Sequence, residues 1–278
     1  MKLTIGKYAS RPVVAVEAEA SVRDALQLMR ERPINRVVVL SQGEVIGLLT
    51  ERDVVFATNW YLGQPELRLK EVMDKPVMTA PEDFTIAQTC QLFAEHPIRH
   101  LVVLNARRDT FGIFSQVDLV CLFRDRIFAN IPDVCALMST KVLQIAPEIS
   151  ARYALSLMAR RSVSTIVVID QEQPIGMFTE REVVRSVADG VDLNEVPVGQ
   201  LMTPSIVTIG CPTTPEEVLN RMQKKSIRQV LVVDNDKRVV GILTPTDLGR
   251  ALEFHQAEET ERLCRYSGEV TEAAPPLI

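Results

Sequence analysis

The sequence predicts an α/β (α+β) protein built from four repeats, each with the order strand, helix, strand, strand, helix (βαββα). The first reason is a short stretch that occurs four times. In each copy a glycine opens a brief apolar strand, a hydroxyl residue ends it, and an acid follows three residues later. The copies are residues 47–53, 112–118, 176–182 and 241–247. The second reason is their regular spacing of about 65 residues, which is typical of a repeat array.

The first unit shows each predicted element in order. Residues 11–16 are a β-branched run after a proline, which is typical of a strand. Apolar residues then recur at helical spacing, and this stripe consists of Val22, Ala25, Leu26 and Met29. Residues 37–40 are a continuous apolar run, as expected for a strand buried on both faces. The turn at 41–44 returns the chain into an antiparallel strand at 45–49, and a second helix is expected after Thr50.

The other three units repeat this order. Their strands are predicted at 77–79, 101–104 and 111–114, at 142–145, 166–169 and 175–178, and at 206–209, 230–233 and 239–243. Their helical stripes consist of Ile86, Thr89, Cys90 and Phe93, of Ala151, Ala154, Leu155 and Met158, and of Val218, Leu219 and Met222.

The units are expected to work in pairs. A single unit of about 55 residues buries too little surface to be stable alone. Units one and three share the pattern Thr-Glu-Arg-acid-Val-Val, at 50–55 and 179–184, so the simplest explanation is duplication of a pair. We therefore expect two pseudo-twofold tandem modules followed by an acidic, partly disordered tail. Module A comprises residues 1–70 and 71–134, module B comprises 135–199 and 200–256, and the tail is 257–278.

Composition excludes several classes of protein. The 278 residues are 46% hydrophobic and 24% charged, which is typical of a soluble globular protein. The net charge is −5 and the basic residues are dispersed, which argues against nucleic acid or an acidic membrane as the main partner. No apolar run approaches the ~18 residues of a spanning helix, and the N-terminus lacks a signal-peptide pattern, so we expect a cytoplasmic protein. The five cysteines lack any Cys-x-x-Cys spacing and are expected to be reduced core thiols.

The sequence predicts no catalytic site. His96, His100 and His255 do not form a metal-spaced cluster. A phosphate loop of the Gly-x-x-x-x-Gly-Lys type and the nucleophile elbow Gly-x-Ser-x-Gly are both missing. We therefore expect neither an enzyme, nor a metal site, nor an obligatory cofactor.

The repeated hydroxyl and acid have two interpretations. Ser/Thr-x-x-Asp/Glu at a strand-to-helix junction is a capping box, which needs no ligand. That motif prefers the longer Glu or Gln at its last position, and only Glu182 fits. Alternatively, a carboxylate beside a hydroxyl can accept hydrogen bonds from the vicinal hydroxyls of a ribose, as in dinucleotide-binding folds. The residues alone leave both interpretations open.

The chain resembles the cystathionine β-synthase (CBS) domain family over nearly all of residues 8–255. The resemblance rests on the Gly-apolar-apolar-Thr/Ser-x-x-Asp signature in four copies, on the order of elements, and on methionine-bearing lead-ins. These lead-ins are residues 72–74, 137–139 and 201–203. Unit one departs from the pattern, because Tyr8-Ala9-Ser10 stands where its methionine lead-in belongs.

The resemblance implies that paired units form two clefts that bind adenosine ligands such as AMP, ADP, ATP or S-adenosylmethionine. In the family, the Thr/Ser and Asp of the signature hold the ribose, and basic residues beside the central strand meet the phosphate. The ribose pairs implied here are Thr50 with Asp53, Ser115 with Asp118, and Thr244 with Asp247. The implied phosphate contacts are Arg36, His100 and Arg228. For Arg36 and His100 the alternative is a solvated strand end.

Unit three is expected to differ. It has Ser164-Thr165 where the other units carry a basic residue, and Glu182 where they carry Asp. We predict that Thr179 and Glu182 act mainly as a helix cap with at best a weak ligand site. Arg52 and Arg181, two residues after the hydroxyl, either face a phosphate or are exposed first-turn arginines.

The predicted function is that of a regulatory, signal-sensing protein. An adenine nucleotide or S-adenosylmethionine bound between units would change their packing, and an unknown effector protein would read the change. The alternative is a ligand-free scaffold built from the same modules. A third possibility is an enzyme that uses Asp53, Asp118 or Asp247 on the ligand. The two modules stack either within one chain or on a second chain, and we expect a homodimer.

Overall fold

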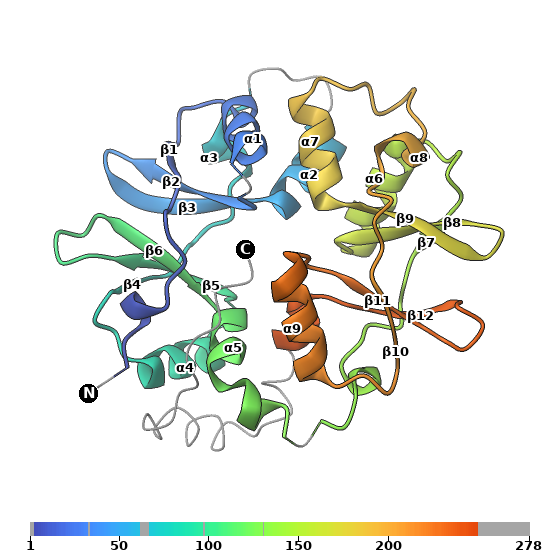
Figure 1. The fold of residues 1–278 in the computed structure, drawn as a ribbon. Helices are drawn as coiled ribbons and strands as arrows, with labels where there is room; N and C mark the ends of the chain where they lie inside the picture. The colour runs from blue at the N-terminus through green and yellow to red at the C-terminus, as the bar shows by residue number, and fades with distance from the viewer. Residues whose placement is uncertain (1–2, 33, 62–66, 97, 130, 250–278) are drawn as a thin grey trace.

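The structure is a computed structural model that describes residues 3–32, 34–61, 67–96, 98–129 and 131–249. These residues form four three-stranded sheets, and each sheet has its strands in chain order. In every sheet the first strand runs parallel to the second, and the third runs antiparallel to it. The predicted fold class is therefore confirmed (Figure 1). The predicted tail at 257–278 lies outside the described residues.

The elements follow the same order in each unit. Unit one consists of β1 (Ala15–Glu17), α1 (Val22–Glu31), β2 (Arg36–Ser41), β3 (Glu44–Thr50) and α2 (Glu51–Tyr61). Unit two consists of β4 (Thr79–Pro81), α4 (Ile86–Glu95), β5 (His100–Leu104), β6 (Thr110–Ser115) and α5 (Gln116–Ile127). Unit three consists of β7 (Gln144–Ile145), α6 (Ala151–Arg161), β8 (Thr165–Asp170), β9 (Gln173–Thr179) and α7 (Glu180–Ala188). Unit four consists of β10 (Thr208–Gly210), α9 (Pro215–Lys225), β11 (Val230–Val233), β12 (Val239–Leu243) and α10 (Pro245–Gly249).

Short helices connect these elements. They are η1 (Ile5–Lys7), α3 (Leu69–Val72), η2 (Val134–Ala136) and α8 (Val198–Leu201). The first long helix of every unit begins at a hydroxyl N-cap, whose side chain accepts a backbone N–H from the first turn and so satisfies one donor that the helix leaves open. The caps are Ser21, Thr85, Ser150 and Thr214.

The two sheets of each module face each other through a small apolar cluster. In module A the cluster contains Val38, Leu48, Val102 and Ile113, and in module B it contains Val167, Met177, Leu231 and Ile242. Each cluster also receives the apolar residues that precede the first strands, namely Val13, Val77, Val142 and Ile206. The pairing of units into two modules therefore has a hydrophobic contact of its own.

The first strand of every unit starts later than predicted. The prediction placed these strands at 11–16, 77–79, 142–145 and 206–209, whereas the paired residues begin at Ala15, Thr79, Gln144 and Thr208. Of the earlier apolar residues, Val13, Val77, Val142 and Ile206 pack, partly buried, against the clusters between the two sheets. Packing against these clusters therefore contributed to the strand-like pattern that the prediction used.

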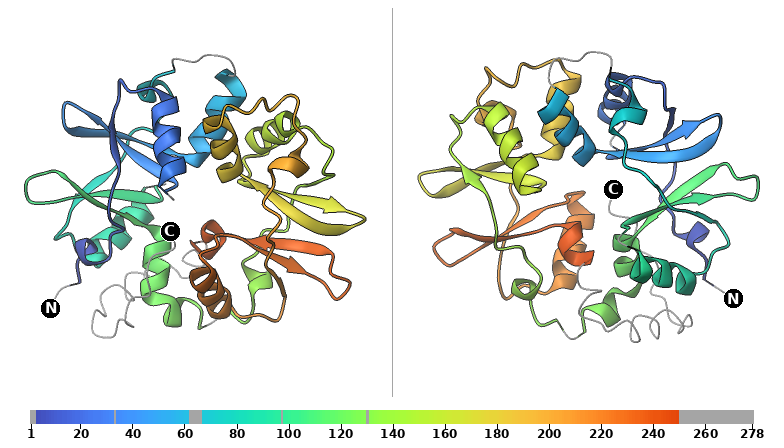
Figure 2. Two further views of the ribbon diagram at one scale, coloured as in Figure 1. Left: turned by 45° about the horizontal axis from the view of Figure 1, so that its top comes forward. Right: turned by 180° about the vertical axis from the view of Figure 1, so that it is seen from behind.

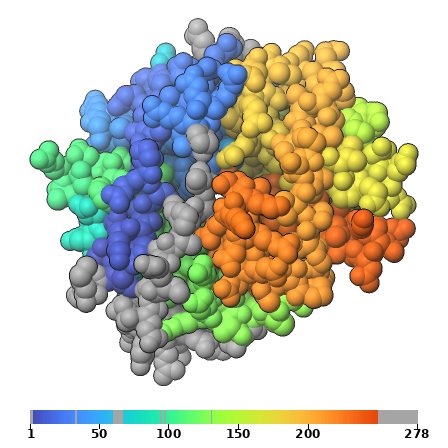
Figure 3. Space-filling view, viewed as in Figure 1, coloured from blue at the N-terminus to red at the C-terminus, as the bar shows by residue number. Residues whose placement is uncertain are grey.

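The lead-ins cross over between the two units of a module. Met73 lies against Gly47 of unit one, Met202 against Gly176 of unit three and Met138 against Gly241 of unit four, and a Cβ on any of these glycines would collide with the methionine sulfur. Each signature glycine is thus needed for a close approach. In the exceptional lead-in of unit one, Ala9 takes the methionine position over Gly112 of unit two. Figure 3 shows these N-terminal residues, in dark blue, running down to unit two.

The two modules stack on each other within one chain. Helices α1 and α2 of unit one contact α7, α2 also contacts α6, and α5 of unit two contacts α10 of unit four. Unit one therefore faces unit three, and unit two faces unit four. Figures 1 and 2 show the resulting ring-like arrangement, with the hairpins at the rim and the helices between the modules.

Three of the described cysteines differ from the prediction. The structure joins Cys135 of η2 to Cys211, which follows β10, by a disulfide with a Cα–Cα distance of 5.4 Å. The expectation of reduced thiols is therefore wrong for these two, because the crossed-over lead-in brings residues 76 positions apart together. It is also wrong for Cys90, which is disulfide-bonded. Cys121 is free and buried, and burial raises the pKa of its thiol to about 12. Cys264 lies outside the described residues.

Candidate functional site

In all four hydroxyl–acid pairs the acid accepts hydrogen bonds from the hydroxyl and the backbone N–H of the preceding cap residue, as the acid of a capping box does. In units one, two and four, the Asp Oδ2 accepts hydrogen bonds from both the hydroxyl and the backbone N–H of the cap residue, at 2.5–2.7 Å. The pairs are Thr50 with Asp53, Ser115 with Asp118, and Thr244 with Asp247. The shorter Asp therefore caps as well as Glu does, and the preference for Glu was not a reason against the capping interpretation.

Capping geometry by itself does not identify a ligand site. Ser21 and Asp24 at the start of α1 form the same box, with the hydroxyl 2.7 Å from Asp24 Oδ2 and the backbone N–H of Ser21 3.3 Å away. This pair lies on an exposed helix start, whereas Ser115 and Asp118 are buried. What distinguishes the four repeat pairs is thus their surroundings.

The second carboxylate oxygen separates unit three from units one and two. Glu182 uses both oxygens, because Oε2 accepts from the Thr179 hydroxyl and backbone and Oε1 accepts from the Thr203 hydroxyl at 2.9 Å. Oδ1 of Asp53 and of Asp118 receives no hydrogen bond from the described residues. Unit three therefore has the geometry of a filled cap, whereas units one and two keep an oxygen that could accept from a diol.

These acids lie in a partly dehydrated environment. Burial raises the pKa of Asp118, against hydrogen bonds from Ser115 and the charge of Arg36. Burial likewise raises the pKa of Asp53, against hydrogen bonds from Thr50. A hydrogen-bond donor on the open oxygen of either acid would offset this cost of desolvation.

The predicted basic residues come from three units. Arg36 begins β2 and is opposite Thr50 in the β2–β3 ladder, and His100 begins β5 and is opposite Ser115 in the β5–β6 ladder. Strand partners lie about 4.5–5.5 Å apart. Units one and two therefore place a basic side chain directly beside a hydroxyl–acid pair.

Arg36, His100 and Arg228 influence one another. Burial lowers the pKa of Arg36 to about 10, with a further decrease from the charge of Arg228 and opposing effects of Asp118 and Glu51. Burial also lowers the pKa of His100 well below its usual value, with contributions from Arg36, Arg99 and Arg228. The imidazole of His100 is therefore neutral at pH 7. The three predicted phosphate contacts therefore lie close enough for their charges to act on one another, and the carboxylates of Asp118 and Glu51 lie among them.

Unit three lacks a base at this position. Thr165 begins β8 and is opposite Thr179, in the register that Arg36 and His100 have in their own units. Its Oγ1 is buried without a hydrogen-bond partner among the described residues. In unit four the equivalent position is Gln229, so Arg228 lies one residue earlier than Arg36 and His100 do.

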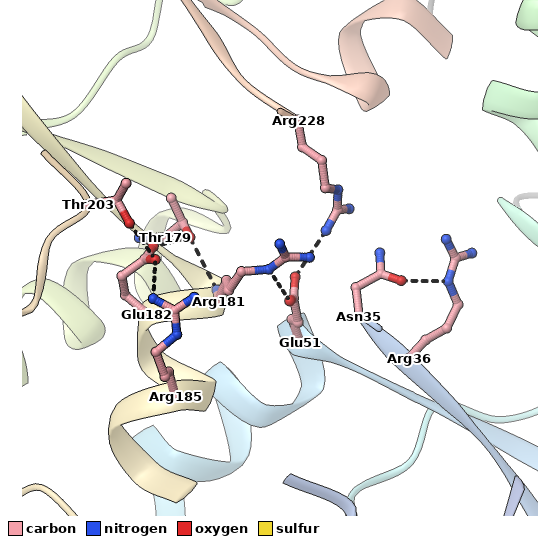
Figure 4. A network of polar contacts seen from close by, with 9 residues as sticks. All are labelled: Asn35, Arg36, Glu51, Thr179, Arg181, Glu182, Arg185, Thr203 and Arg228. Atoms are coloured by element: carbon pink, nitrogen blue, oxygen red, sulfur yellow. Dashed lines mark hydrogen bonds and ion pairs between the residues drawn. The ribbon is translucent and has the colours of Figure 1, made fainter. Parts of the chain in front are cut away.

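Arg52 and Arg181 are partly exposed first-turn arginines, as one of their two interpretations expects, and each also forms an ion pair between the modules. Arg52 Nε lies 3.2 Å from Glu180 Oε1, and Arg181 Nε lies 3.3 Å from Glu51 Oε1. Glu51 Oε2 also receives Arg228 Nη1 at 3.1 Å (Figure 4). The sequence analysis missed Glu51 and Glu180. Their repetition in the shared Thr-Glu-Arg pattern was the available signal, since opposite charges at adjacent positions can pair across a twofold axis.

Another feature of the described residues lies away from the hydroxyl–acid pairs. A cavity of about 430 Å³ lies beside β4 and the β5–β6 turn, and none of the predicted ribose or phosphate residues lines it. The described residues contain no cluster of His, Cys, Asp and Glu suited to a metal ion. Nor do they include a helix with the length and apolar character needed to cross a membrane.

The fold and the site define a four-repeat protein in which each module pairs two α/β units and the acids face the contacts between units. The CBS domain family matches this chain four times, at residues 5–58, 69–125, 133–189 and 198–253. The chain belongs to the CBS domain family.

Individual relatives extend over different parts of the chain. The crystal structure of protein MJ1225 from Methanocaldococcus jannaschii, described as a candidate archaeal homologue of g-AMPK, covers 90% of this chain with all of its own, at 17% identity and a TM-score of 0.74. In sequence, MJ1225 is 25% identical over 200 residues, 66% of this chain and 71% of its own length. A CBS domain pair of the M. jannaschii protein MJ0100, in complex with 5′-methylthioadenosine and S-adenosyl-L-methionine, covers 43% of this chain and 98% of its own, at 24% identity and a TM-score of 0.40.

The relatives include enzymes. The inosine-5′-monophosphate dehydrogenase of Korarchaeum cryptofilum is 30% identical over 109 residues, which are 39% of this chain. The match spans only 22% of that enzyme's length.

Proposed function

We propose that this protein is a non-catalytic regulator that binds an adenosine ligand between paired units and passes occupancy to a separate effector protein. The observation that carries the proposal is the strand pairing of Arg36 with Thr50 and of His100 with Ser115. It supports a site in which an acceptor for a ribose diol and a donor for a phosphate lie side by side. Membership of the CBS domain family supports adenosine as the nucleoside.

The charges favour phosphate ligands among the candidates. Arg36 and Arg228 are cationic and His100 is a neutral hydrogen-bond donor in the same region. Guanidinium groups bind phosphate through charge-assisted hydrogen bonds. The same groups repel the sulfonium of S-adenosylmethionine. We therefore order the ligands as AMP, ADP and ATP before S-adenosylmethionine, with units one and two as the main sites.

Ligand-dependent stabilisation tests the proposal. A ligand that binds only the native state adds roughly 2.7 kcal/mol at ~100 times its Kd, which a melting scan detects. Asp118→Asn should weaken AMP binding about ten- to a hundredfold, because it removes a charged acceptor but keeps an oxygen for the Ser115 cap. Asp24→Asn is the matched control, since Asp24 forms the same box at an exposed helix start. Equal weakening in both variants would contradict a ligand role for Asp118.

The filled cap of unit three favours a second candidate function, a ligand-free scaffold. If every unit used its pair only as Thr179 and Glu182 do, no cleft would need an occupant. A failure of AMP, ADP, ATP, adenosine and S-adenosylmethionine to shift the melting curve would support the scaffold. Turnover of a ligand by the isolated protein would instead support an enzyme, which is contrary to our proposal.

The assembly of the protein forms part of the proposal. The modules already stack within one chain, so a second chain is not needed to complete that contact. The homodimer predicted from the sequence stays a prediction, which light scattering on the purified protein tests. The effector protein likewise stays unidentified.

A further inference from the structure

Glu51 is a buried carboxylate with both oxygens engaged by arginines of the other module. Its exposed fraction is 5%. Oε1 receives Arg181 of unit three at 3.3 Å, and Oε2 receives Arg228 of unit four at 3.1 Å. Figure 4 shows the carboxylate between the two guanidinium groups. One side chain of unit one thus links units three and four.

Among the described residues, the equivalent acid in unit three receives no second arginine. Glu180 occupies the same position of the Thr-Glu-Arg pattern, and the ion pair that it forms across the modules is with Arg52 at 3.2 Å. The contact between units one and three is otherwise reciprocal, because each unit donates one arginine and accepts one. The pseudo-twofold symmetry between units one and three is therefore broken at Glu51, because Glu51 also binds Arg228 of unit four.

Arg228 is also one of the three predicted phosphate contacts. Its guanidinium and the Glu51 carboxylate both act on Arg36, which places Glu51 among the same basic groups. Arg36 itself is oriented by Asn35, whose Oδ1 accepts from Arg36 Nε at 2.9 Å. A carboxylate and a phosphate both bind a guanidinium through paired oxygens. Glu51 thus occupies the place on Arg228 that an anionic ligand requires.

We propose that Glu51 is an internal anion that competes with the ligand phosphate for Arg228. The inference rests on the proposed function and adds the regulation of that site. In the unliganded protein, Glu51 holds Arg228 and so ties unit four to unit one. When a phosphate takes Arg228, Glu51 keeps only Arg181, and the tie between units one and four is lost. A nucleoside without phosphate leaves the tie intact, so the protein distinguishes AMP from adenosine by its own packing.

Calorimetric titration of the full chain with AMP and with adenosine tests this inference. Glu51→Gln removes the competing charge and should bind AMP about tenfold more tightly than the wild type, a gain of about 1.4 kcal/mol. Adenosine affinity should be the same in both proteins. Glu180→Gln is the matched control, because it removes the same charge from the same motif without releasing Arg228. Its AMP affinity should stay within about threefold of the wild type.

A second variant keeps the inference testable if the first variant does not fold. Should Glu51→Gln fail to fold, Glu51→Asp keeps the charge but withdraws the carboxylate by one methylene. It should bind AMP more tightly than the wild type, by a smaller factor. A melting scan of each unliganded variant confirms that the native state is populated.

The possible outcomes separate this inference from the proposed function. Equal AMP affinity in wild type, Glu51→Gln and Glu180→Gln would overturn the competition and leave the ligand proposal intact. Tighter AMP binding in both glutamine variants would also overturn it, because general charge removal would then be the cause. Binding of neither AMP nor adenosine to any of the proteins would overturn both. AMP binding by Glu51→Gln, but not by the wild type or Glu180→Gln, would support the competition most strongly, because Glu51 would then exclude the phosphate completely.

Discussion

The two contacts between the modules are built from different chemistry. Units two and four share one continuous hydrophobic core, which includes α5 residues 119–123 and Leu248 of α10. Units one and three keep separate cores, which exchange the buried residues Val55 and Val184 and the partly buried residues Phe56, Val187 and Ala188. Their remaining contacts include the reciprocal ion pairs of Glu51 and Glu180.

The sequence explains this difference at equivalent positions. The first two residues after the hydroxyl are Glu-Arg in units one and three, Gln-Val in unit two and Pro-Thr in unit four. Apolar burial is non-directional and scales with the area buried. An apolar contact is therefore stable, and it does not respond to salt or to competing ions as a charged contact does. Charged contacts depend on geometry, salt and competing ions. One side of the ring thus holds the modules together, and the other side can respond to an anion.

The largest expected effect is on the apolar side. Leu248→Ala removes a fully buried side chain from the core that units two and four share, and it should cost about 3 kcal/mol of unfolding free energy. The cost combines lost transfer free energy with the cavity left behind. Val55→Ala, on the charged side, removes less volume from an exchanged position and should cost less. Chemical denaturation of both variants measures the difference, and equal losses would contradict the division between the two contacts.

The fold was more predictable than the site, because its pattern is local. Helical spacing placed residues such as Leu26 and Met158 on buried faces, and both are buried. Hydrophobic runs likewise placed the second and third strands of each unit. These signals depend on neighbours within a few residues, which the sequence displays directly.

The contacts that were missed join residues far apart in the chain. Glu51 and Arg181 are 130 positions apart, and Glu51 and Arg228 are 177 apart. The crossing of Met73 onto unit one and the Cys135–Cys211 disulfide also depend on how units pair. Periodicity says nothing about which units face each other. The hydroxyl–acid pairs were found because both of their residues lie in one motif.

An intermediate effect is expected on the charged side. Arg52→Gln, Glu180→Gln and the double variant form a cycle, and the coupling free energy should be about 1 kcal/mol at low salt. The estimate is modest because Arg52 is partly exposed. The coupling should shrink in 1 M salt, where the Debye length falls to about 3 Å. The Leu248→Ala loss should not shrink with it. A coupling that salt leaves unchanged would contradict the electrostatic nature of this contact.

The smallest expected effect is a pH dependence that originates in the basic cluster. The folded pKa of His100 lies well below that of the unfolded chain, so the unfolded state takes up a proton first as pH falls. Stability should therefore decrease between pH 8 and pH 6, by about 0.8 kcal/mol for an unfolded pKa near 6.5.

His100→Asn isolates this contribution. The raised pKa values of Asp53, Asp118 and Glu180 act in the opposite direction, because each of these acids takes up its proton in the folded state first as pH falls. They are present in both proteins and cancel in the difference. Denaturation at pH 8 and pH 6 should show the wild type losing more stability than His100→Asn. With saturating AMP the loss should diminish, since a bound phosphate favours the protonated imidazole. A wild type and variant that lose stability equally would show that His100 is not held neutral by this cluster.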